Sequence, residues 1–203
     1  MNTPIRLVFA VMFLSVLSFP SSRPASADSR ETPEKPRISL NEISLGSGYV
    51  KGSFKFALCD YSVTPVFIRV GFDISPLVGL EGRTSSLQLA FEPFINSIQG
   101  TNKGIEAGSS IGVRYFKKIA RSVDLFTEGS VAPMSLGIDT WEQGRSGFNF
   151  LDQIGGGLQY KFFENSAFFF GYRLRHISNA NLFNRHNAGI NSQGFIGGIS
   201  WLY

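Results

Sequence analysis

From about residue 39 to the C-terminus, apolar and polar residues alternate with a period of two. Val66 and Ile68, for example, fall on one face of such a segment, and Arg69 and Asp73 fall on the other. Alternation of this kind predicts β-strands, because successive side chains point to opposite faces of a strand. Turn-forming Gly, Asn, Ser and Asp residues separate the segments. The pattern predicts eight strands, near residues 39–50, 57–74, 84–97, 105–119, 121–135, 147–163, 166–179 and 189–203.

Each predicted strand has one large apolar face and one face that mixes glycine, aromatic residues and charges of both signs. In a soluble lipocalin-like barrel the apolar face would point inward, whereas in an outer-membrane barrel it points outward to lipid. Charges of both signs suit a small packed lumen, and the chain ends in an alternating aromatic strand at residues 199–203. We therefore predict an all-β fold, an eight-stranded antiparallel transmembrane (outer-membrane) β-barrel over residues 39–203. An interior of this size is filled by side chains, which argues against a general porin.

The N-terminus has the features of a secretory signal peptide. Arg6 is followed by an apolar run over residues 7–17 and by Ala25-Ser26-Ala27, an A-x-A cleavage site. The apolar run is too short to span a membrane as a helix. We predict a cleaved signal peptide over residues 1–27 and a polar, flexible leader over residues 28–38.

Composition excludes several classes of function. The full chain carries a net charge of +4, with 19 basic and 15 acidic residues. Removing the signal peptide removes Arg6 and Arg23, which lowers the charge to 17 − 15 = +2. No cluster of Lys and Arg stands out, so we expect no nucleic-acid partner. The single cysteine, Cys59, excludes an intramolecular disulfide, and no Cys/His cluster has metal-ligand spacing. We therefore expect neither a metal nor another cofactor.

A histidine and a serine interrupt the apolar face of the seventh segment. His176 and Ser178 have the same parity as Phe170 and Leu174, whereas the arginines of this segment have the opposite parity. The pair therefore points to lipid, and Asn191 has the lipid-facing parity in the last segment. With both termini in the periplasm, the seventh strand runs outward and the eighth returns. The three residues should then converge on adjacent strands at the cell-surface end of the barrel.

Such a group predicts an esterase. Ser178 would attack an ester carbonyl, His176 would accept its proton, and Asn191 would orient the imidazole. Asn179 or a nearby backbone N–H could help to stabilise the oxyanion. A lipid-facing site implies a lipid substrate that arrives by lateral diffusion. The alternative is a non-enzymatic barrel, structural or adhesive, in which His176 is an interfacial residue and Ser178 begins a turn.

The motifs His-Ile-Ser-Asn-Ala at 176–180 and Asn-Ala-Gly-Ile-Asn-Ser at 187–192 resemble the PagL family, the outer-membrane lipid A 3-O-deacylases. The resemblance implies that His176 is the catalytic base and Ser178 the nucleophile. It also implies a location in the bacterial outer membrane. The expected partners are lipid A or lipopolysaccharide, as substrate, and outer-membrane lipids; a homodimer is a further candidate assembly.

One position departs from the family pattern, in which a glutamate is the third triad residue. Asn191 occupies that place here. An asparagine can accept a hydrogen bond from imidazole, but it cannot stabilise imidazolium by charge. Asn187 matches another asparagine of the family motif, which implies loop positioning or oxyanion support.

Overall fold

The computed structural model describes residues 37–203 except 57–59, 81–83, 101 and 183–185. The expected signal peptide, nearly all of the expected leader and Cys59 lie outside the described residues. Those two N-terminal segments therefore stay predictions.

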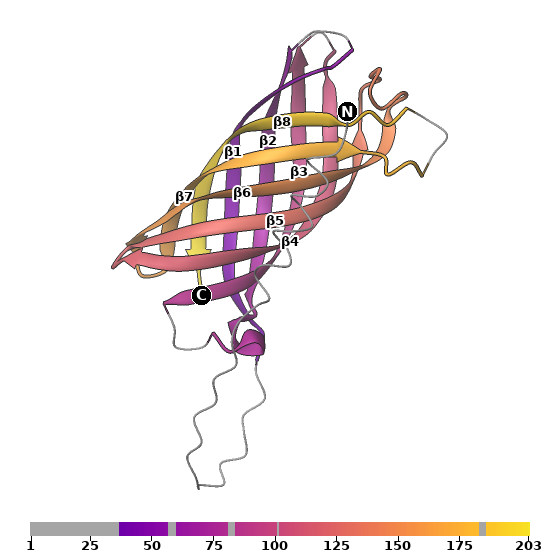
Figure 1. Ribbon diagram of the computed structural model, residues 1–203. Coiled ribbons are helices and arrows are strands. Elements are labelled where there is room, and N and C mark those ends of the chain that lie inside the picture. The colour runs from indigo at the N-terminus through magenta and orange to yellow at the C-terminus, as the bar shows by residue number, and fades with distance from the viewer. Residues whose placement is uncertain (1–36, 57–59, 81–83, 101, 183–185) are drawn as a thin grey trace, which may run out of the picture. The chain divides into compact units, whose positions relative to one another are not determined.

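Eight antiparallel strands form a closed barrel in which each strand pairs with its neighbour in the chain and the first pairs with the last (Figure 1). This confirms the predicted fold class. A 3₁₀ turn, η1 (Ser75–Val78), lies between the second and third strands. The strands are β1 (Ser39–Ser53), β2 (Asp60–Asp73), β3 (Ser85–Gly100), β4 (Gly104–Ala120), β5 (Val123–Leu136), β6 (Gly147–Phe163), β7 (Ser166–Ser178) and β8 (Ile190–Leu202).

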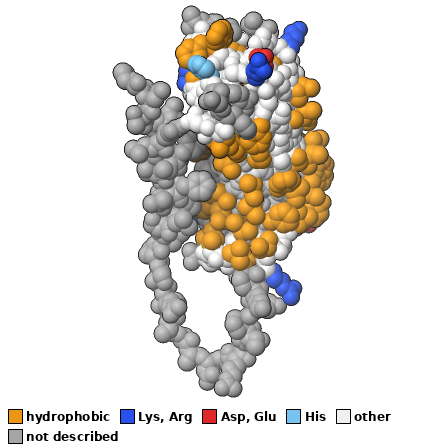
Figure 2. Space-filling model, turned by 90° about the vertical axis from the view of Figure 1, so that its right-hand side faces the viewer, with side chains coloured by type: hydrophobic (Ala, Val, Ile, Leu, Met, Phe, Trp, Pro, Cys, Tyr) orange, Lys and Arg blue, Asp and Glu red, His pale blue; other side chains and the backbone are white. Residues whose placement is uncertain are grey.

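The outer wall of the barrel is apolar. Val66 and Ile68 on β2 are 45% and 51% exposed, whereas Phe67 and Arg69 between them are buried. Figure 2 shows the apolar side chains gathered in a broad band, with charged side chains mainly above and below it. A soluble barrel needs the opposite orientation, so this finding rules out the soluble alternative. Within the described residues, no helix is long and apolar enough to cross a membrane.

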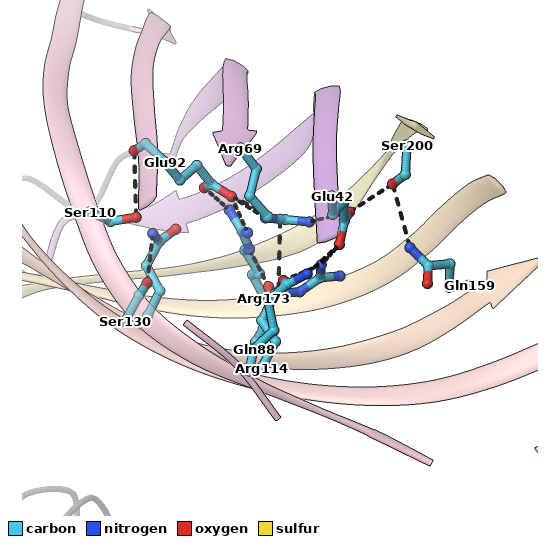
Figure 3. Close-up of polar contacts among 12 residues, drawn as sticks. Glu42, Arg69, Gln88, Glu92, Ser110, Arg114, Ser130, Gln159, Arg173 and Ser200 are labelled. Atoms are coloured by element: carbon cyan, nitrogen blue, oxygen red, sulfur yellow. Dashed lines mark hydrogen bonds and ion pairs between the residues drawn. The ribbon is translucent and has the colours of Figure 1, made fainter. Parts of the chain in front are cut away.

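The lumen holds a network of buried charges of both signs (Figure 3). Glu92 accepts two hydrogen bonds from Arg173, at 2.7 and 2.9 Å, and one from Arg69 at 2.9 Å. Three carboxylates face three guanidinium groups, so the network is neutral, as charges removed from water require. Its members, each from a different strand, are Glu42, Arg69, Glu92, Arg114, Glu128 and Arg173.

Aromatic rings and close packing fill the space around this network. The guanidinium carbon of Arg69 lies 5.1 Å from the ring centroid of Phe169, and that of Arg114 lies 4.6 Å from that of Phe126. Both distances suit cation–π contacts. Two cavities in the lumen measure about 10 and 20 Å³, room for about one water molecule each. The interior is therefore filled by side chains, as expected for eight strands.

We expect Glu92→Gln to destabilise the barrel strongly. The change keeps the side-chain volume but removes one carboxylate from Arg69 and Arg173, which leaves three buried guanidinium groups facing two carboxylates. Breaking a buried ion pair from one side typically costs about 3–5 kcal/mol. Denaturant unfolding of the protein in detergent micelles would measure the change in the free energy of unfolding.

Lys51→Ala is the matched control, because it breaks the exposed 2.8 Å ion pair with Asp60. An exposed pair contributes little, so the unfolding midpoint should not move. Equal effects of the two substitutions would show that the lumen network does not stabilise the fold.

Candidate functional site

The candidate site lies where β7 ends and β8 begins, at the upper right of Figure 1. The register between the two strands places His176 directly opposite Asn191. Both side chains are on the outward parity, because the residues that flank them, Arg175, Ile177 and Ile190, are buried. A cross-strand pair of this kind brings the two Cβ atoms to roughly 4.5–5.5 Å.

His176 and Asn191 form a short hydrogen bond. The Nδ1 atom of His176 lies 2.6 Å from the Oδ1 atom of Asn191. An amide oxygen can only accept, so Nδ1 carries the proton and donates it. The opposite ring nitrogen, Nε2, is then unprotonated in the neutral ring and can act as a base. The structure thus brings together two of the three residues that the sequence placed at this site.

Ser178 lies two residues beyond His176 on the same face of β7. Across the β6–β7 pair it is opposite Phe150, whereas the pairing of β7 with β8 ends at Ile177. Among the described residues, its hydroxyl forms no hydrogen bond with the imidazole. Hydrogen bonds between reacting groups often tighten only when a substrate is bound. Ser178 therefore lies beside His176 on the outer wall of the barrel.

Gly189 fits closely against the His176 ring. Its φ angle of +74° lies in the left-handed region, which side chains other than glycine rarely adopt. A Cβ atom placed there would come within 2.5 Å of the Cε1 atom of His176. The glycine in the 187–192 motif therefore lets the chain approach the imidazole and enter β8.

Three asparagines hold the turn that follows β7. The backbone N–H of Asn179 donates to Oδ1 of Asn187 at 3.0 Å, and Nδ2 of Asn187 donates to Oδ1 of Asn181 at 3.0 Å. Asn179 is fully buried, and its own Nδ2 donates to the carbonyl of His186 at 2.8 Å. The Asn179 side chain thus forms its hydrogen bonds within the loop. Asn187 is half-buried and has a second N–H on Nδ2, which forms no hydrogen bond with another described residue.

Contacts from two other loops hold the segment between Asn187 and β8. The N–H of Ala188 donates to the carbonyl of Glu142 at 2.8 Å, and Nζ of Lys55 donates to the carbonyl of Ala188 at 2.9 Å. The Glu142 carboxylate is buried and accepts the backbone N–H of Phe56 at 3.0 Å. These long-range contacts fix the backbone that positions Gly189 and Asn191. No sequence pattern indicates these contacts, because they join loops that lie far apart along the chain.

The β6–β7 register places another carboxylate, that of Asp152, directly opposite His176. Asp152 is not among the residues that the sequence pattern predicted for this site, although a signal was available. The outward parity of β6 is otherwise apolar around it, and an acid that interrupts such a row is unusual. The apolar members of the row are Phe148, Phe150, Ile154, Leu158 and Tyr160.

The site therefore offers a base, an adjacent hydroxyl and amide donors, which are the parts needed for acyl transfer. The described residues contain no group of three or more His, Cys, Asp or Glu side chains that could hold a metal ion.

Comparisons with known proteins identify the family of the chain and confirm its fold. The family model described as "Lipid A 3-O-deacylase (PagL)" matches residues 60–200. The crystal structure of the outer membrane enzyme PagL superposes with a TM-score of 0.52 at 18% identity, over 77% of this chain and 97% of that chain. Neisserial surface protein A (NspA) superposes with a TM-score of 0.54 at 15% identity, over 82% and 99% of the two chains. At such identities the structural likeness shows the fold alone. No curated protein matches the chain by sequence.

We expect Gly189→Ala to displace the His176 ring and break its hydrogen bond with Asn191. The new Cβ would collide with Cε1 of His176, and the left-handed backbone would add strain of roughly 1–2 kcal/mol. NMR of the protein with ¹⁵N-labelled histidine would detect the change in tautomer or in hydrogen bonding at Nδ1.

Gly79→Ala is the matched control, because Gly79 also has a positive φ, +68°, but nothing lies within 4 Å of a Cβ placed there. It should carry the backbone strain without any change in the histidine signals. Unchanged histidine signals in Gly189→Ala would contradict the proposed fit.

Proposed function

The chain belongs to the lipid A 3-O-deacylase (PagL) family, and from this premise we propose that it is a serine esterase that hydrolyses the 3-O-linked acyl chain of lipid A. The family and the barrel fold place the protein in the outer membrane, with lipid A as the substrate of the family. The proposal adds the residues that act and the ester that is cleaved. It gives His176 and Ser178 the roles of base and nucleophile.

The 2.6 Å hydrogen bond between His176 and Asn191 on the lipid-facing wall carries this proposal. Polar residues are energetically costly on a surface that faces lipid, so a hydrogen-bonded polar pair there indicates a functional role. Asn191 holds the imidazole in the tautomer that leaves Nε2 free. That tautomer is the one a serine nucleophile requires of its base.

In the proposed reaction, Oγ of Ser178 attacks the ester carbonyl while Nε2 of His176 takes the hydroxyl proton. The tetrahedral intermediate collapses as the bond to the sugar oxygen breaks, and the imidazolium returns the proton to that oxygen. Water then attacks the acyl-serine by the same route, which releases a free fatty acid and restores Ser178. The second Nδ2 proton of Asn187 is the candidate donor to the oxyanion.

The wall below the site suits an acyl chain. Leu174 is the outward-facing residue of β7 just before His176. Tyr172, the outward-facing residue before Leu174, makes an edge-to-face contact with Phe195 of β8, with ring centroids 5.0 Å apart. Phe150 lies across from Ser178. With the termini in the periplasm, the site faces the outer leaflet, so lipid A could reach it by lateral diffusion.

We expect cells that express this chain to contain lipid A that has lost one acyl chain, and cells that express Ser178→Ala to contain unmodified lipid A. Loss of the nucleophile should lower the rate by a factor on the order of 10³ or more. Mass spectrometry of extracted lipid A, with fragmentation to locate the missing chain, makes the measurement.

Ser166→Ala is the matched control, since Ser166 has the same outward parity at the opposite end of β7. It should retain full activity. Unchanged lipid A with folded wild-type protein in the membrane would favour the non-enzymatic barrel instead.

We further expect Asn191→Ala to lower kcat about 100-fold or more while KM changes little. The substitution removes the acceptor that fixes the imidazole tautomer, which is needed in the transition state but not for binding lipid. Steady-state deacylation of lipid A in mixed micelles would separate the two constants.

Gln193→Ala serves as the comparison, because Gln193 is the next outward-facing residue on β8. A kcat that is equal in both variants would remove Asn191 from the proposed mechanism.

A further inference from the structure

Asp152, His176 and Asn191 form one row across three adjacent strands. Asp152 on β6 is the direct cross-strand partner of His176, and Asn191 on β8 is its partner on the other side. All three have outward parity, so the imidazole is flanked by a carboxylate and by an amide. Direct partners on antiparallel strands have Cβ atoms roughly 4.5–5.5 Å apart.

The Asp152 carboxylate is exceptional on this wall. In the strands that the structure describes, the outward-facing carboxylates are Asp60 and Asp152. Asp60 is the first residue of β2 and pairs with Lys51 at 2.8 Å. The Asp152 side chain forms no ion pair or hydrogen bond with another described residue and is only partly exposed. A carboxylate without a cation is costly on an apolar wall, which suggests that a nearby group uses its charge.

As direct cross-strand partners, the Asp152 carboxylate and the His176 ring are close enough for a charge on one to act on the other. The proposed reaction makes His176 a cation each time it holds the serine proton. Asn191 is neutral and orients the ring without stabilising that cation. No direct hydrogen bond joins Asp152 to the ring among the described residues, so the carboxylate would act through space or through a bridging water.

We propose that Asp152 is a positioning residue that supplies, from the strand on the other side of His176, the negative charge that Asn191 lacks. This inference rests on the proposed function of His176 as the base. The third role of the triad is thereby divided, with orientation from β8 and charge from β6.

The test is a double-mutant cycle of Asp152→Asn and Asn191→Glu, measured as kcat and KM for lipid A in mixed micelles. Asp152→Asn keeps the side-chain volume and should lower kcat about 10- to 100-fold, as for two unit charges ~5 Å apart in a partly screened site, with KM nearly unchanged. Asn191→Glu places a carboxylate directly against the imidazole, so adding it to Asp152→Asn should restore much of the kcat that Asp152→Asn loses. Asp152→Glu, which keeps the charge, should be less impaired than Asp152→Asn.

Asp60→Asn is the matched control, because it removes the other outward-facing carboxylate, and it should leave kcat unchanged. A kcat that falls in Asp152→Asn without rescue by Asn191→Glu would point to a structural role and overturn the proposal. So would an effect confined to KM.

The rate at which an alkyl fluorophosphonate labels Ser178 gives a second readout that does not depend on lipid A. Slower labelling of Asp152→Asn than of the wild type would support the role of Asp152. If lipid A were at the same time unmodified in cells that express the wild type, the role of Asp152 would stand but the proposed substrate would be wrong. Equal labelling of wild type and Asp152→Asn would overturn the role of Asp152. A wild-type protein that is not labelled at all would overturn both proposals.

Discussion

A neutral network of buried charges holds the barrel together. Ser200 on β8 donates to Glu42 at 2.7 Å and accepts from Gln159 on β6 at 3.4 Å, so the network of three glutamates and three arginines reaches all eight strands. These charges are inside because lipid surrounds the outer wall, and each strand must send its polar residues inward. The same constraint makes any polar residue on the outer wall exceptional. The candidate site consists of such exceptions.

This constraint explains why the fold could be predicted from the sequence. Strand alternation assigns each side chain to a face, and a slip of one residue would turn every arginine of β7 towards lipid. The observed strands lie close to the predicted ones. Among the differences, β1 ends at Ser53 and β3 at Gly100, whereas the sequence predicted ends at residues 50 and 97. The ends are less certain because pairing there depends on hairpin geometry, which alternation does not encode.

The site could be predicted only in part. Parity placed His176, Ser178 and Asn191 on one wall, and strand order made β7 and β8 neighbours. The cross-strand register decides which residues lie opposite each other, and it brought His176 to Asn191 on one side and to Asp152 on the other. Register is set by all eight pairings together. The contacts of Lys55 and Glu142 with the loop before β8 likewise depend on the closed barrel.

An asparagine in the third triad position is chemically reasonable once the two tasks of that position are separated. A carboxylate there accepts the Nδ1 proton and also offsets the charge of the imidazolium. Near lipid, a carboxylate held against a neutral histidine bears the cost of desolvation throughout the catalytic cycle. An amide fixes the tautomer without that cost, and a carboxylate one strand away, partly exposed to its surroundings, can still stabilise the cation. The outward row of Asp152, His176 and Asn191 provides such a division within a wall that is otherwise apolar.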